Sequence, residues 1–120
     1  MPDASKITWF FFGFQGRIDR QAFALGGLLL YVARLFPVYR IIANPDEAAQ
    51  SFWGGVFLIV IGVALVSHVA MCAKRLHDIN RSGWLALLFV VGDILMFLVL
   101  CFLPGTRGPN RFGSQTNAPR

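Results

Sequence analysis

The sequence predicts an all-α membrane protein, a bundle of three hydrophobic helical segments preceded by a short interfacial helix. Three observations predict this class: 56% of the 120 residues are hydrophobic, 14% are charged, and the apolar residues gather in three long runs. A bilayer crossing needs roughly 20 mostly apolar residues, and ordinary soluble domains are less apolar than this chain. We expect a single membrane domain, residues 1–113, followed by a disordered tail, residues 114–120.

Residues 7–14, ITWFFFGF, form the first apolar stretch, which is too short to cross a bilayer. A polar cluster follows it directly. We therefore expect this stretch to lie at the membrane interface, with its aromatic rings at the depth of the lipid headgroups.

The first hydrophobic segment, residues 21–43, carries Arg34 and Arg40 and has Pro37 near its far end. Its uninterrupted apolar core, residues 22–33, would also suit the apolar region of a secretory signal peptide. Because no small-residue cleavage site follows cleanly and two further apolar segments do, we interpret it as a membrane segment.

The other two hydrophobic segments are more uniform. Residues 52–73 carry no formal charge and are interrupted only by Ser67 and His68, and residues 84–103 are interrupted only by Asp93. Both segments have the length of a bilayer crossing.

Basic residues lie at the edges of these segments. The region before the first segment and the loop after the second each carry several, whereas the loop at 44–51 carries only Asp46 and Glu47. This positive-inside pattern predicts a cytoplasmic N-terminus and second loop, and it explains the net charge of +5 better than nucleic-acid binding does. The basic residues concerned are Lys6, Arg17, Arg20, Lys74, Arg75 and Arg81.

The C-terminal tail poses a topological problem. It contains Arg107, Arg111 and Arg120 and no acid, yet three full crossings would place it on the far side of the membrane. Either the third segment breaks at Gly92-Asp93 and re-enters, which returns the tail to the cytoplasm, or the tail is translocated regardless of its charge. We favour the cytoplasmic tail.

Three polar blocks flank the hydrophobic segments: FQGRIDRQAF, AKRLHDINRSGW and LPGTRGPNRFG. In this order they resemble the signature blocks of a bacterial inner-membrane family, the domain of unknown function numbered 805. The resemblance covers about residues 12–113, and it implies a multi-pass protein of the bacterial inner membrane but no known reaction. One departure lies at residues 91–93, VGD, where such proteins often have a proline and a glycine near the middle of the third segment.

The polar blocks permit two interpretations of their charged residues. Arg17 and Arg20 are three positions apart, as are Arg75 and Asp78, so each pair would share a helical face. One hypothesis is a site for an anionic lipid headgroup, and the other, which we favour, is an interfacial ion network in which Asp19 and Asp78 supply the acids. The residues of this candidate site are Arg17, Arg20, Arg75, Asp78, Asn110 and Arg111.

Two charges fall inside the hydrophobic segments. Arg34 and Asp93 lie about 20 Å and about 14 Å from the cytoplasmic ends of their segments, at about 1.5 Å per residue. An unpaired charge at that depth costs at least about 2.5 to 3.5 kcal/mol. We therefore predict an intramembrane pair between Arg34 and Asp93. The alternative is that Asp93 faces a water-filled pathway.

A catalytic role is not predicted. His77 and Asp78 are neighbours, but neighbouring helical side chains point about 100° apart, and no Ser or Cys is placed to act as a nucleophile. We expect no cofactor and no metal, because metal-ligand spacing of Cys or His is not present.

The predicted role is therefore non-enzymatic: organisation of lipids or the envelope, or service as an accessory subunit. The expected partner is the bilayer, with its anionic headgroups, and not nucleic acid. The alternative is an oligomeric transporter or channel that uses Asp93, since three short helices cannot enclose a pathway alone.

Overall fold

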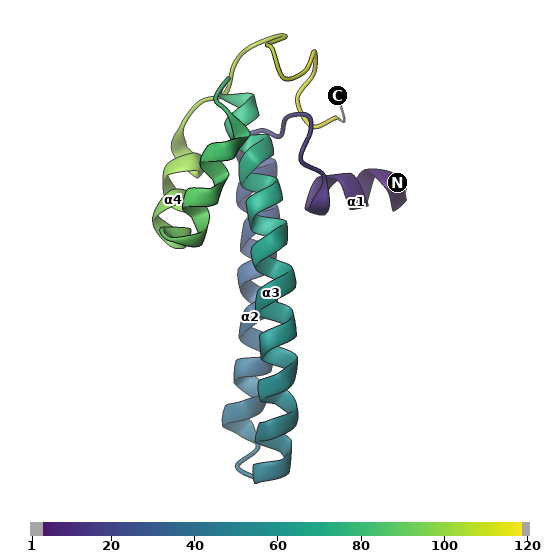
Figure 1. Cartoon of the computed structure of the whole chain (residues 1–120), viewed down its shortest axis with the longest axis vertical. Helices are drawn as coiled ribbons and strands as arrows, with labels where there is room; N and C mark the ends of the chain where they lie inside the picture. The colour runs from purple at the N-terminus through teal and green to yellow at the C-terminus, as the bar shows by residue number, and fades with distance from the viewer. Residues whose placement is uncertain (1–3, 119–120) are drawn as a thin grey trace.

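The computed structural model describes residues 4–118, and its helices are arranged around one long antiparallel pair (Figure 1). This confirms the predicted class, an all-α membrane protein with a short helix before the first hydrophobic segment. Two helices, α2 and α3, are long and apolar enough to cross a membrane by length and composition. The elements are α1 (Ala4–Phe12), α2 (Arg20–Ala43), α3 (Glu47–Asp78), the 3-10 helix η1 (Gly83–Val90) and α4 (Asp93–Phe102).

Aspartate side chains begin both long helices. Asp19 accepts a hydrogen bond from the backbone N–H of Ala22 at 2.8 Å, and Asp46 accepts one from Ala49 at 3.1 Å. An aspartate in this position satisfies backbone donors that the first helical turn leaves unpaired. At the end of α2, the Asn44 side chain donates to the carbonyl of Arg40 at 2.8 Å. These local bonds define the short loop that reverses the chain between α2 and α3.

The second predicted segment is only the middle of a longer helix. The 32 residues of α3 extend about 48 Å at about 1.5 Å per residue, whereas a hydrocarbon core is roughly 30 Å thick. The charged residues after position 73 therefore continue the same helix instead of forming a loop. This places the side chains of Lys74, Arg75 and Asp78 on a rigid element.

The third hydrophobic segment is broken and turns back. It consists of η1 and α4, which have eight and ten residues, and the chain reverses at Val91 and Gly92. The backbone N–H groups of these two residues both donate to the carbonyl of Leu88, at 3.1 and 2.8 Å. As a result, the end of α4 lies beside the beginning of η1, and the tail starts at the same end of the bundle as residues 13–19 (Figure 1). The predicted break of the third segment is present, and the chain turns back there.

The buried core lies at this same end of the bundle. Its members come from the linker before α2 and from α2, α3, η1 and α4, whereas the far half of the α2–α3 pair exposes large apolar side chains such as Leu35, Ile42 and Leu58. Such a surface suits contact with lipid. The core residues are Ile18, Phe23, Met71, Cys72, Ala73, Leu76, Ala86, Phe89 and Leu100.

The first helix lies across the axis of the long pair (Figure 1). The hydroxyl of Ser67 on α3 donates to the carbonyl of Phe11 at 2.8 Å, which fixes the end of α1 to the bundle. This helix starts and ends slightly earlier than the predicted interfacial stretch, residues 7–14.

Candidate functional site

Asp78 is the centre of a buried ionic cluster at the end of α3. Its Oδ1 atom accepts from Arg17, whose Nε and Nη2 atoms lie at 3.0 and 2.9 Å, and from the hydroxyl of Thr116 at 2.8 Å. Its Oδ2 atom accepts from Nη1 of Arg75 at 2.8 Å. Arg17 and Arg75 are at most 1% exposed, and Asp78 is 3% exposed. We call Arg17, Arg75, Asp78 and Thr116 the Asp78 cluster.

The remaining donors of the two arginines bind backbone carbonyls. Arg17 donates through Nη1 to Gly108 and through Nη2 to Thr106, each at 2.7 Å. Arg75 donates through Nε to Leu100 at 3.0 Å and through Nη2 to Leu103. The cluster thus joins the linker before α2, the end of α3, the end of α4 and the tail.

The backbone around the Asp78 cluster packs closely against Asp78. A Cβ atom on Gly105 would lie 1.9 Å from Oδ2 of Asp78, so a side chain there would displace the carboxylate. The backbone N–H of Thr106 also donates to the carbonyl of Asp78, at 2.7 Å. The PG pair that follows the third segment is therefore part of the site.

The structure brings only some of the predicted polar residues together. Arg17, Arg75 and Asp78 meet, whereas Arg20 is exposed and approaches the carbonyl of Phe102 at 3.4 Å. Asn110 donates to the carbonyl of His77 at 2.9 Å, and Arg111 approaches the carbonyl of Asn80 at 3.4 Å. Because the two buried arginines direct their donors at Asp78 and at carbonyls, the geometry favours the ion network over an anion site centred on them.

The tail and Asp19 contribute contacts that the sequence did not predict. The side-chain amide of Asn117 donates to Asp19 at 2.9 Å, and its backbone N–H donates to the carbonyl of Arg17 at 2.8 Å. Together with Thr116, these bonds place residues expected to be disordered against the polar end of the bundle. Residues 119 and 120 of that tail lie outside the described residues.

Lys74 is a third buried cation, and the sequence did not predict its partners. Its Nζ atom donates to the carbonyls of Trp9 and Phe10 and lies 4.8 Å from the centre of the Trp9 ring. The carbonyls at a helix C-terminus lack partners within the helix, and the helix dipole favours a cation there. No pattern in the sequence pairs Lys74 with α1, because the two lie far apart along the chain.

A second polar cluster lies midway along the bundle. Arg34 on α2 donates through Nη1 to Asp93 of α4 at 3.2 Å, so the predicted pair meets. Tyr31 donates its hydroxyl to the other carboxylate oxygen of Asp93, and Nη2 of Arg34 lies 2.7 Å from Nδ1 of His68 on α3. We call these four residues the Asp93 cluster.

The partners of His68 define its tautomer. A guanidinium group can only donate, so Nδ1 of His68 accepts from Arg34, and the ring proton resides on Nε2. That atom lies 3.2 Å from the carbonyl oxygen of Gly27, to which it donates a hydrogen bond. His68 is fully buried and neutral in this arrangement, and it connects α2 to α3. Sequence reasoning identified Arg34 and Asp93 but did not include Tyr31 or His68 with them.

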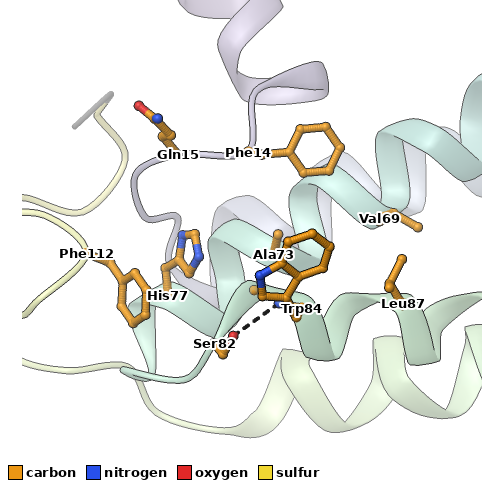
Figure 2. A pocket seen from close by; sticks show the side chains of 10 residues that line it. Phe14, Gln15, Val69, Ala73, His77, Ser82, Trp84, Leu87 and Phe112 are labelled. Atoms are coloured by element: carbon orange, nitrogen blue, oxygen red, sulfur yellow. Dashed lines mark hydrogen bonds between the residues drawn. The ribbon is translucent and has the colours of Figure 1, made fainter.

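An apolar pocket of about 570 Å³ opens beside the Asp78 cluster (Figure 2). Val69, Ala73 and His77 line it at successive turns of one α3 face, and the ring of His77 is stacked on Phe112 with 4.1 Å between ring centres. The Nδ1 atom of His77 lies 2.9 Å from the carbonyl of Gly16, to which it donates. His77 therefore faces the pocket while Asp78 faces the arginines, so the two do not form a catalytic pair. The other lining residues are Phe14, Gln15, Ser82, Gly83, Trp84 and Leu87.

Comparison with known proteins agrees with the resemblance of the three polar blocks. Residues 11–114 match the sequence profile of the family described as "Protein of unknown function (DUF805)". The chain is 30% identical over 112 residues to the inner membrane protein YhaH of Escherichia coli strain K12, covering 90% of each chain. It is 31% identical over 105 residues to the inner membrane protein YhaI of the same strain, covering 85% of this chain and 84% of YhaI. No solved structure matches it.

Proposed function

The chain belongs to the DUF805 family, and we propose that it is a multi-pass inner-membrane protein with a structural, non-enzymatic role in organising its surrounding lipids. In this proposal α2 and α3 cross the bilayer, the η1–α4 hairpin re-enters, and both chain ends lie in the cytoplasm. The localisation is supported by the two relatives named as inner membrane proteins. The orientation is supported by the positive-inside pattern of the basic residues.

The observation that supports this proposal is that the buried charges of the Asp78 cluster bind groups of the protein itself. Two arginines and one aspartate, all buried, bind each other, and the arginines also bind carbonyls at the end of α4 and in the tail. A catalytic or transport site needs polar groups that reach a substrate, whereas these groups hold the hairpin and the tail against the long helices. The same arrangement requires the tail to lie on the side where α2 begins.

Labelling of single cysteines tests the topology. In a chain with Cys72→Ala and Cys101→Ala, we would compare Ser114→Cys in the exposed tail with Ala48→Cys, an exposed position in the first helical turn of α3 at the opposite end. With an impermeant thiol reagent on intact cells, we expect Ala48→Cys to react and Ser114→Cys to react only after the membrane is opened. Reaction of Ser114→Cys in intact cells would contradict the proposal, because the tail would then lie outside.

A second candidate function, an oligomeric transporter or channel, is favoured by one feature of the Asp93 cluster. The Asp93 side chain is 29% exposed, and Nε of Arg34 is buried without a hydrogen-bond partner among the described residues. A water molecule could accept from Nε of Arg34 and donate to Asp93, as in a water-filled pathway. If Asp93→Asn abolishes an ion flux in proteoliposomes while the protein stays folded, transport is the function; loss of stability alone supports the structural role.

A further inference from the structure

The pocket beside His77 has the chemistry of a lipid-binding site. Its volume of about 570 Å³ is typical of a small-ligand pocket. Most of its lining is apolar, and its few polar side chains are Gln15, His77 and Ser82. A site of this composition suits a molecule with one long apolar part and one polar end.

The polar and apolar parts of the lining are separated along α3. Val69 and His77 are eight residues apart, so the α3 face extends about 12 Å along the helix at about 1.5 Å per residue. His77 lies near the polar end of the bundle, with Phe112 beside it, whereas Val69 and Leu87 lie at the other end of the pocket, toward the middle of the bundle (Figure 2). In the proposed topology the pocket therefore runs from the cytoplasmic surface into the bilayer, in the direction of an acyl chain.

Two exposed arginines lie next to residues that line the pocket. The guanidinium group of Arg111 lies 4.7 Å from the centre of the Phe112 ring, which itself lines the pocket, and Arg111 also approaches Asn80. Arg81 is exposed and directly precedes Ser82, another lining residue. Among the described residues no acid lines the pocket, and the nearby Asp78 is bound by its two arginines. An anionic group at these arginines would meet cations without an opposing carboxylate.

We propose that this pocket binds one acyl chain of an anionic phospholipid of the cytoplasmic leaflet, with the lipid phosphate at Arg81 and Arg111. The inference rests on the proposed membrane topology, because the pocket must open to the inner leaflet. It reassigns headgroup binding from Arg17 and Arg75, which are buried and occupied, to two exposed arginines next to the pocket lining. Aromatic side chains at the pocket mouth, Phe14 and Trp84, are 52% and 80% exposed and suit the headgroup region.

Native mass spectrometry of the full chain in a neutral detergent tests this site with two lipids that share the same acyl chains, phosphatidylglycerol and phosphatidylcholine. We expect one phosphatidylglycerol to bind at about tenfold lower concentration, since two basic residues near a surface each favour an anionic lipid. Replacing both arginines, Arg81→Gln with Arg111→Gln, is expected to abolish the difference between the lipids. Arg107→Gln, an exposed arginine outside the pocket, is the matched control and is expected to preserve it.

Filling the pocket tests the acyl-chain part. Val69→Phe is expected to lower the occupancy of both lipids several-fold, while Leu58→Phe, on the exposed far half of α3, leaves it unchanged. Leu87→Phe fills the same space from the exposed surface of η1. It replaces Val69→Phe in this test if that variant fails to fold. Equal binding of the two lipids to the unmodified chain, or equal losses from Val69→Phe and Leu58→Phe, would overturn the site.

The two proposals fail in distinguishable ways. If Ser114→Cys reacts in intact cells while phosphatidylglycerol still binds preferentially in detergent, the topology and the assignment to the cytoplasmic leaflet are wrong, but the pocket still binds an anionic lipid. If the tail is protected but no preference is measured, the pocket is wrong and the topology stands.

Discussion

At the scale of single residues, Asp78 is the group on which the polar end of the molecule depends. Its carboxylate forms ion pairs with two buried guanidinium groups, from residues 61 and three positions away in the sequence. A buried ion pair adds little net stability over well-packed apolar residues, but removal of one partner leaves a charge uncompensated. Because Asp78 has two such partners, its replacement leaves more uncompensated charge than the replacement of any other residue in the cluster.

We therefore predict that Asp78→Asn lowers the free energy of unfolding by about 3 to 5 kcal/mol, the usual cost of breaking a buried pair. The amide can still form hydrogen bonds, but it carries no charge to offset Arg17 and Arg75. Denaturation in mixed micelles, followed by circular dichroism, measures the change. Asp46→Asn is the matched control, because asparagine caps a helix as well as aspartate does, and its effect should stay within about 0.5 kcal/mol. Equal effects of the two substitutions would contradict this role of Asp78.

The Arg34–Asp93 pair makes a second prediction at this scale. We expect Asp93→Asn and Arg34→Gln each to destabilise the protein, and the double variant to lose less than the sum of the two, with a coupling of about 0.5 to 3 kcal/mol. The physical reason is that either single change leaves the partner's charge unpaired within a hydrophobic segment. Unfolding free energies of the four chains complete the cycle. Additive losses would show that the two side chains do not act as a pair.

At the scale of elements, the sequence is most informative where the controlling signals are local. The apolar runs identify α2 and α3, Asp19 and Asp46 mark their N-termini, and the basic tail indicates that the third segment turns back. Local patterns do not identify partners across long sequence distances. For this reason Lys74 was counted as a loop charge, although it binds α1, and Tyr31 was not recognised as a partner of Asp93.

The candidate site was predictable to a similar degree. The spacing of Arg75 and Asp78 predicts a pair that the structure contains. The same reasoning grouped Arg20 with Arg17, but residues before the Asp19 cap are not helical, so the two side chains diverge. The position of its block at the membrane edge also predicts Arg111 in the candidate site with Arg17 and Arg75, but the structure places it against Asn80 and Phe112.

The close packing of α2 against α4 leads to a prediction about the contact between these two helices. A Cβ atom on Gly27 would lie 2.2 Å from the Phe97 ring, so we expect Gly27→Ala to force α4 outward and lower stability by about 1 to 3 kcal/mol. The thermal unfolding midpoint in detergent would fall. Gly62→Ala is the matched control in α3, where no neighbouring atom lies within 4 Å and alanine is the better helix former. If the two variants unfold alike, α4 does not pack on Gly27 as described.

At the scale of the whole molecule, one end of the bundle holds the core, the Asp78 cluster and the tail, and the other end is a bare pair of helices (Figure 1). A pair of helices whose large side chains are exposed has little reason to persist in water, whereas lipid solvates the same surface. The asymmetry therefore favours a protein anchored by its polar end and surrounded by lipid along the far half. The charged blocks, which are distant in the sequence, are adjacent in space because all of them lie at the polar end.

The depth of the η1–α4 hairpin supplies the last prediction. Eight residues of 3-10 helix rise about 16 Å and ten residues of α-helix about 15 Å, so each arm covers only about half of a roughly 30 Å hydrocarbon core. The turn at Val91, which is 89% exposed, should then lie near the middle of the bilayer. In a chain without other cysteines, we expect Val91→Cys to resist an impermeant thiol reagent from both sides, while Ala48→Cys reacts from outside. Reaction of Val91→Cys in intact cells would mean that the segment crosses the membrane, and the contacts between Arg75 and the end of α4 could not then form.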